Sequence, residues 1–157
     1  MIDINLERRG ALTHGATVAA LLIGLGWMPS ARAQTAFNRA AFEAKSMADV
    51  LKALGASAPV ESKEVTLTAP DIAENGAVVP VAAATAIAGA RRILLLVEKN
   101  PNALAAAFDV SDAVDANFST RVKMGQTSNV YAVAITADNK AFFAQKEVKV
   151  TLGGCGG

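Results

Sequence analysis

The sequence contains only one cysteine, one histidine and one tryptophan, and aromatic residues make up 5% of its 157 residues. The histidine, His14, and the tryptophan, Trp27, lie near the amino terminus, whereas the cysteine is Cys155. Residues 34–157 therefore contain no histidine. This absence excludes a Ser-His or Cys-His catalytic dyad and a histidine metal ligand from that part of the chain.

Apolar runs long enough to cross a membrane are also absent. The uncharged run over residues 15–29 is too short, since a spanning helix needs about 20 apolar residues. Arg8 and Arg9 precede this run, and Ala31-Arg32-Ala33 follows it. A basic start, a short apolar core and an Ala-x-Ala end are the three parts of a secretory signal. We therefore predict a signal peptide over residues 1–33 and a periplasmic mature protein without a membrane span; a buried N-terminal helix is the alternative.

The paired arginines leave the route of export open. Two consecutive arginines are typical of the twin-arginine (Tat) route, which exports folded proteins. Glu7 precedes the pair, however, and Ala11 stands where a larger apolar residue is usual. Twin-arginine export and general secretion are therefore equal alternatives.

Positive and negative charges are balanced in the predicted mature protein, which begins at Gln34. Of the 15 basic and 14 acidic residues, the predicted signal peptide removes three and two: Arg8, Arg9 and Arg32, and Asp3 and Glu7. The 12 residues of each sign that remain give a formal net charge of zero. Such a balance gives no electrostatic basis for binding nucleic acid or an anionic membrane. We also expect no cofactor and no metal site.

Two short helices are expected at the start of the mature domain. Ser46 is a good N-cap, Asp49 follows three residues later as in a capping box, and Gly55 can end the helix with a positive φ. Between Ser46 and Gly55, four apolar residues have the i, i+3, i+4, i+7 spacing of one helix face: Met47, Val50, Leu51 and Leu54. The segment Ala36–Lys45 has a weaker pattern of the same kind.

From Glu64 onward the pattern is that of short strands separated by turn residues. This alternation of strands and turns predicts a mainly β protein, an immunoglobulin-like antiparallel β-sandwich with short N-terminal helices. Helix is an alternative for the alanine-rich stretch Ala82–Ala90, although Pro80 and Gly89 oppose a long helix there. The expected strands are Glu64–Thr68, Ala77–Ala84, Arg92–Glu98, Leu104–Val110, Asn117–Met124, Asn129–Thr136 and Lys140–Leu152.

Two of these strands are apolar on both faces. Residues Ile93–Val97 form a continuous apolar run, and Phe142 and Phe143 are adjacent, so that in a strand they point to opposite sides. A sandwich strand with one face in water should alternate instead. Either the N-terminal helices or a partner subunit must therefore cover the second face.

The chain ends in a tail of glycines around its one cysteine. An alternating strand pattern runs to Leu152 and is followed by Gly153, Gly154, Cys155, Gly156 and Gly157. Glycine has no side chain and samples both signs of φ, so we expect a thin, flexible arm that can carry the thiol into a narrow channel of another protein. A frayed terminus is the alternative. It does not explain the lone cysteine, because exported proteins avoid unpaired thiols.

The sequence around Cys155 does not activate its thiol. A neighbouring Lys, Arg or His, or a helix N-terminus, would lower a cysteine pKa, and the residues beside Cys155 are all glycine. The carboxylate of Gly157 would slightly disfavour the thiolate. We therefore interpret Cys155 as an attachment point on which other proteins act.

The Gly-Gly-Cys-Gly-Gly ending after a strand resembles the SoxY family, the carrier subunits of the bacterial sulfur-oxidation (Sox) system. Three internal segments are similar to that family as well, namely Asp71–Val81, Glu98–Pro101 and Arg121–Ser128. The resemblance covers nearly all of Phe37–Gly157. It divides the chain into a signal peptide (1–33), a SoxY-like sandwich with N-terminal helices (34–152) and a carrier arm (153–157).

The resemblance implies that Cys155 holds sulfur intermediates covalently and that the chain is a carrier, not an enzyme. A haem c complex would join thiosulfate to the thiol oxidatively, giving a cysteine S-thiosulfonate. A metal-dependent hydrolase would then release the terminal sulfone group as sulfate, and a sulfur dehydrogenase, where present, would oxidise the remaining sulfane sulfur. The carrier would work as a heterodimer with a SoxZ-like subunit, a second β-sandwich that travels with it during folded export.

Three other functions stay open from the residues alone. The single thiol could form an intermolecular disulfide and make a Cys155-linked homodimer without a carrier role. The chain could also be a secreted structural or adhesive sandwich without chemistry. An enzyme is the third alternative, because Asp109, Asp112 and Asp115 have the spacing of a loop or metal cluster. They lack the central glycine and closing glutamate of a calcium loop, so we interpret them as solvated loop charges.

Overall fold

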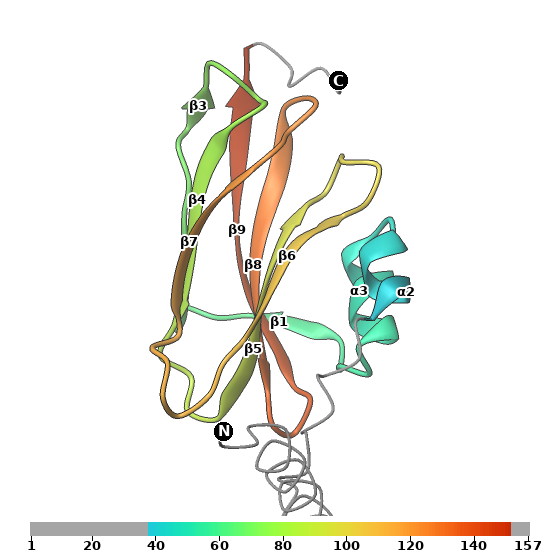
Figure 1. The fold of residues 1–157 in the computed structure, drawn as a ribbon, viewed down its shortest axis with the longest axis vertical. Coiled ribbons are helices and arrows are strands. Elements are labelled where there is room, and N and C mark those ends of the chain that lie inside the picture. Colours follow the sequence, from blue (N-terminus) through green and yellow to red (C-terminus); the bar gives the residue numbers. More distant parts are fainter. Residues whose placement is uncertain (1–37, 152–157) are drawn as a thin grey trace, which may run out of the picture. The chain divides into compact units, whose positions relative to one another are not determined.

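The strands form two sheets that pack face to face, with two short helices on the outer face of the larger sheet (Figure 1). The computed structural model describes residues 38–151. The predicted signal peptide and the glycine tail lie outside these residues. The larger sheet has the order β1-β9-β8-β5-β6, with β3 also paired to β9, and the smaller sheet has the order β2-β4-β7.

The bounds of the elements follow the predicted segments closely. They are α2 (Arg39–Glu43), α3 (Met47–Ala53), β1 (Pro59–Glu61), β2 (Val65–Thr68), β3 (Ile72–Ala73), β4 (Val79–Thr85), β5 (Ala90–Val97), β6 (Leu104–Asp109), β7 (Asn117–Val122), β8 (Ser128–Thr136) and β9 (Ala141–Val150). The mainly β fold predicted from the sequence is confirmed, and the alanine-rich stretch is strand β4 followed by a turn in which Gly89 has a φ of +75°.

Helix α3 begins and ends where its capping residues predict, and α2 lies within the weaker predicted segment Ala36–Lys45. The Ser46 hydroxyl oxygen accepts the backbone N–H of Asp49 at 3.2 Å, and Gly55 follows α3 with a φ of +70°. Helix α2 begins after Asn38, whose side chain accepts the N–H of Ala41 and donates to the carbonyl of Ala53 at 2.8 Å. Asn38 therefore caps one helix and ties it to the end of the other.

The seven long strands pair antiparallel, as predicted, whereas the sequence pattern does not reveal β1 and β3. Both of these short strands pair with β9 in the parallel direction, Val60 opposite Phe142 and Ala73 opposite Val150. Segments of three and two residues are too short to show an alternation of apolar and polar positions. Their pairing extends the edge of the larger sheet along both halves of β9.

Strand β5 is covered on both faces by parts of the same chain, whereas Phe142 and Phe143 of β9 are partly buried, one against each of the two cores. Ile93, Leu95 and Val97 of β5 point into the core between the two sheets, while Leu94 and Leu96 point into a second core beneath the helices. All five side chains are at most 1% exposed. The helices are therefore the cover that the sequence required. The apolar faces of β5 give no independent reason to expect a partner subunit.

Candidate functional site

The sequence places the chemistry at Cys155, and the described residues end four positions before it, at Thr151. Cys155 and the flanking glycines Gly153, Gly154, Gly156 and Gly157 lie outside the described residues. The structure does show the place from which the tail departs. This place, the tail base, is the end of β9 over residues 149–151, at the end of the sandwich that lies at the top of Figure 1.

Hydrogen bonds hold the tail base on both of its sides. On one side the backbone N–H of Lys149 donates to the carbonyl of Asp71 at 3.0 Å, and that of Thr151 donates to the carbonyl of Ala73 at 3.1 Å. The Thr151 hydroxyl also donates to the carbonyl of Glu74 at 3.2 Å. On the other side the N–H of Val150 donates to the Thr127 hydroxyl oxygen at 3.0 Å. The ladder of β9 is thus maintained up to its last residue.

Three loops meet beside the tail base and are joined by hydrogen bonds. The β7–β8 loop is linked to the β3–β4 loop because the N–H of Met124 donates to the carbonyl of Gly76 at 2.7 Å. It is linked to the β5–β6 loop because the Asn100 side-chain amide donates to the carbonyl of Lys123 at 2.7 Å. The Met124 side chain is fully buried. These bonds fix the loops to one another around the place where the tail starts.

The loops that meet here contain the three segments singled out in the sequence. Asp71–Val81 includes β3 and the β3–β4 loop, Glu98–Pro101 lies in the β5–β6 loop, and Arg121–Ser128 includes the β7–β8 loop. The sequence pattern does not predict that they come together, because their contacts join residues more than 20 positions apart. The feature they share is their position at one end of the sandwich.

An ion pair fastens the segment before β3 to the middle of β9. The Lys146 ammonium donates to the Asp71 carboxylate at 2.9 Å and to the carbonyl of Ala69 at 2.6 Å. The hydrogen bond from Lys146 and its positive charge lower the pKa of the Asp71 carboxyl below its ordinary value. The pair therefore positions the segment that leads into β3.

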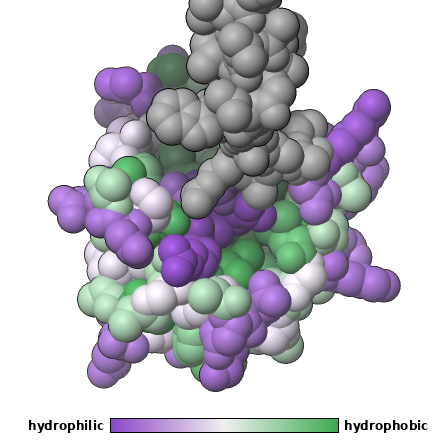
Figure 2. All heavy atoms as spheres, turned by 60° about the horizontal axis from the view of Figure 1, so that its bottom comes forward, coloured by the Kyte–Doolittle hydropathy of each residue, from purple (hydrophilic) through white to green (hydrophobic). Residues whose placement is uncertain are grey.

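The acidic residues considered from the sequence as an enzyme site lie at the opposite end. The Asp109 carboxylate accepts a hydrogen bond from the Arg92 guanidinium at 2.6 Å. The Asp112 carboxylate lies 3.9 Å from the Arg91 guanidinium. Within residues 38–151, no three His, Cys, Asp or Glu side chains are grouped so that they could hold a metal ion. Figure 2 views the molecule from this end and shows hydrophilic side chains projecting around its rim.

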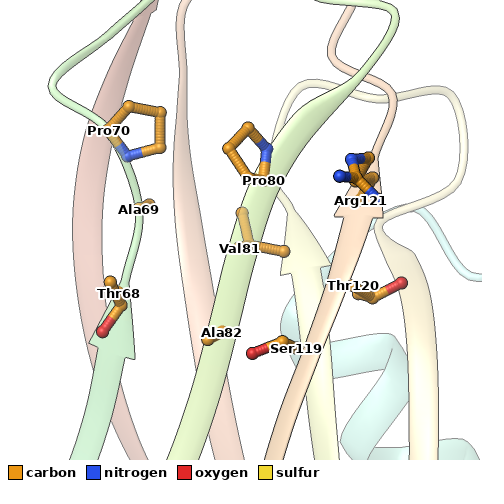
Figure 3. A pocket seen from close by; sticks show the side chains of 9 residues that line it. All are labelled: Thr68, Ala69, Pro70, Pro80, Val81, Ala82, Ser119, Thr120 and Arg121. Atoms are coloured by element: carbon orange, nitrogen blue, oxygen red, sulfur yellow. The ribbon is translucent and has the colours of Figure 1, made fainter.

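A shallow pocket of about 490 Å³ lies on the smaller sheet, across β4 and β7 (Figure 3). Arg121 is its one charged residue, and the other residues that line it are Thr68, Ala69, Pro70, Pro80, Val81, Ala82, Ser119 and Thr120. Small apolar groups and hydroxyls with a single cation offer no acid and base pair for catalysis.

Over residues 38–151, no helix is long and apolar enough to cross a membrane.

Comparisons with known proteins point to one family. The model of the family described as "Sulfur oxidation protein SoxY" matches residues 50–155, a range that includes Cys155. The solved structure of the sulfur carrier protein SoxY from Chlorobium limicola f thiosulfatophilum is 37% identical, with a TM-score of 0.59, over 66% of this chain and 93% of that one.

Matches of lower identity accompany it. The superoxide reductase (neelaredoxin) from Ignicoccus hospitalis is 18% identical, with a TM-score of 0.49, over 55% of this chain and 79% of that chain. A putative superoxide reductase from Thermotoga maritima is 11% identical, with a TM-score of 0.46, over 55% of this chain and 84% of that chain. None of the curated proteins matches the sequence.

Proposed function

The chain belongs to the SoxY family of sulfur oxidation proteins, and from this premise we propose that it carries thiosulfate-derived intermediates covalently on Cys155. The observation that carries the proposal is the family match, which extends through residue 155 and so includes the one thiol of the chain. The hydrogen-bonded tail base supports it, because β9 is held in place up to four residues before that thiol.

The loading step forms a sulfur–sulfur bond. The Cys155 thiolate and thiosulfate lose two electrons in total and form a cysteine S-thiosulfonate, in which the sulfane sulfur of thiosulfate is bonded to Sγ. The electrons pass to a haem c complex, which acts as the oxidant. No residue of this chain needs to supply redox chemistry, and the part it plays is to present the thiol.

The release step is a hydrolysis. Water attacks the terminal sulfone sulfur, sulfate leaves with two protons released at neutral pH, and a persulfide anion remains on Cys155. A metal-dependent hydrolase supplies this chemistry, and a sulfur dehydrogenase, where present, oxidises the remaining sulfane sulfur. The carrier is therefore a substrate that successive enzymes bind and not a catalyst.

We propose a periplasmic location for this cycle, after removal of residues 1–33 by either export route. We further propose a SoxZ-like partner subunit, and this proposal now rests on family membership alone. The two apolar faces of β5 are covered by the smaller sheet and by the helices, so they give this proposal no support. A Cys155-linked disulfide homodimer is the second candidate state, favoured by the presence of a single thiol in a chain for which we propose export.

The substitution Cys155→Ser tests the proposal. A serine hydroxyl cannot form a sulfur–sulfur bond, so thiosulfate oxidation should fall to background in cells that carry the variant and in a reconstituted system. The residue lies beyond the last strand, and the free energy of unfolding should change by no more than about 0.5 kcal/mol, as for other surface substitutions. Unchanged thiosulfate oxidation by a folded serine variant would refute the carrier role.

A further inference from the structure

Exposed aliphatic side chains flank the tail base. Among residues 38–151, four large apolar side chains are exposed, and two of these belong to β3 and the β3–β4 loop: Ile72 (57% exposed) and Val78 (54%). The other two are Val60 and Val114. Val60 lies opposite Phe142, near the start of β9, and Val114 lies in the β6–β7 loop at the end of the sandwich opposite the tail base.

Ile72 and Val78 are held firmly relative to the tail base. The strand of Ile72 pairs with β9 in register, Ile72 opposite Lys149, and the neighbouring Ala73 side chain is buried. The loop of Val78 begins at Glu74, which accepts the hydroxyl of Thr151. The next residue after Val78 is buried Val79 of β4. The two exposed side chains therefore belong to a fixed surface and not to a free loop.

The length of the tail limits how far a partner can be from this surface. Cys155 is four positions after Thr151, and even a fully extended chain spans at most about 14 Å over four positions. An enzyme that acts on Cys155 must bring the entrance of its active site within this distance of Thr151. The surface around the tail base must then face the rim of that entrance.

Ile72 and Val78 supply exposed apolar area among charged groups of both signs. Asp71 is paired with Lys146, and the exposed Glu74 and Lys149 have opposite signs. Isolated exposed aliphatic side chains are common on proteins and need no explanation. What distinguishes Ile72 and Val78 is that their segments are hydrogen-bonded to the tail base. Every enzyme that acts on Cys155 has to approach the tail base.

We propose that Ile72 and Val78 form a docking surface for the enzymes that act on Cys155, an inference that rests on the proposed carrier function. The occupant is an enzyme with a narrow channel for the tail and an apolar rim around its entrance. Such a contact is small and transient, which suits a carrier that must leave one enzyme for the next. The surface would contribute to the affinity of each encounter and not to the chemical step.

The test uses the full mature chain, in complex with its partner subunit, and a purified sulfate-releasing hydrolase. The carrier is loaded without any enzyme, because the Cys155 thiolate displaces thiosulfate from tetrathionate and retains the S-thiosulfonate. Sulfate release is then measured against carrier concentration for wild type, for Ile72→Ser with Val78→Ser, and for the matched control Val114→Ser. Val114 is 47% exposed at the opposite end, so the control removes a similar apolar surface.

The double variant should raise the KM for the loaded carrier by about tenfold, since it removes the burial of two aliphatic side chains. Its kcat, its rate of labelling by a small thiol reagent and its Tm should match those of wild type, and Val114→Ser should match wild type throughout. Equal KM values for the double variant and the control would overturn the docking surface while leaving the carrier function intact.

Two further outcomes would also overturn the inference. Loss of the partner subunit from the double variant during purification would assign the surface to the subunit interface. Absence of sulfate release from the loaded wild-type carrier would refute the proposed function itself, together with the docking surface that rests on it.

Discussion

At the scale of single residues, the proposed arm predicts that the glycines beside Cys155 are needed for turnover by the partner enzymes. Gly154→Val or Gly156→Val adds a β-branched side chain, which restricts the backbone and widens the tail. Enzymes that admit the tail into a channel should then release sulfate at least about tenfold more slowly. A small thiol reagent needs no channel and should label Cys155 at a near-normal rate, and this labelling serves as the control. Equal sulfate release by wild type and both valine variants would rule out the arm account.

Asp138 provides a pH test of the β8–β9 turn. Hydrogen bonds from Lys140 and Thr136 lower the pKa of the Asp138 carboxyl to about 2 from its ordinary 3.8. Because the folded pKa lies below the unfolded one, the carboxylate stabilises the fold fully above pH 3.8, and this contribution is lost as the pH falls towards 2. Asp138→Asn should therefore be less stable than wild type at pH 7, and the difference should shrink between pH 4 and pH 2.

Urea unfolding at a series of pH values measures this difference. Asn139, at the same turn, has a φ of +60°, a conformation that asparagine tolerates better than most residues. Its side chain should not titrate, so Asn139→Gly is the control and should keep the acid dependence of wild type. A stability difference between Asp138→Asn and wild type that is constant from pH 2 to pH 7 would show that the turn does not depend on the carboxylate.

At the scale of elements, β5 joins two cores, and a pair of substitutions separates them. Leu94 lies under the helices and Leu95 between the sheets, and both are fully buried. Replacing either by Ala should cost about 2–5 kcal/mol, as for other buried leucines. Leu94→Ala should in addition lower hydrogen-exchange protection in α2 and α3 below that in β4, whereas Leu95→Ala should not. Equal loss of protection in the helices of both variants would argue against a separate helix core.

The sequence predicts those elements whose pattern is local. The cap at Ser46, the helix end at Gly55 and the long strands all have signals within a few residues, and the structure confirms them. Strands β1 and β3 have no such signal, because they are defined by their pairing with β9. The apolar run of β5 shows that both faces are buried, but only the fold shows that the helices supply the second cover.

The same limit applies to the candidate site. Cys155 can be predicted from sequence because a lone thiol among glycines is a local pattern. The tail base is not, since Thr127, Asp71 and Glu74 reach β9 through contacts across the sandwich. Ile72 and Val78 give no sequence signal either, because exposure is decided by the packing of the whole domain. The arm itself lies outside the described residues and stays a prediction.

At the scale of the whole molecule, the domain separates stability from chemistry. Both cores, the helices and the long strands stabilise the sandwich without contributing a reactive group, and the thiol is attached beyond the last strand. Since β9 is hydrogen-bonded on both sides up to Thr151, the base of the tail is fixed. In the function that we propose, the chemistry on the thiol is supplied by partner enzymes. This division suits a protein that several enzymes must bind in turn.

The most direct measurement of the central claim is the intact mass of the protein purified without reductant from cells grown on thiosulfate, followed by fragmentation to locate any adduct. We predict a chain that begins at Gln34 and includes a population with a thiosulfate-derived group on Cys155, which a thiol reductant removes and which Cys155→Ser lacks. Purified protein that contains only the free thiol or the Cys155-linked dimer, during active thiosulfate oxidation, would contradict the account.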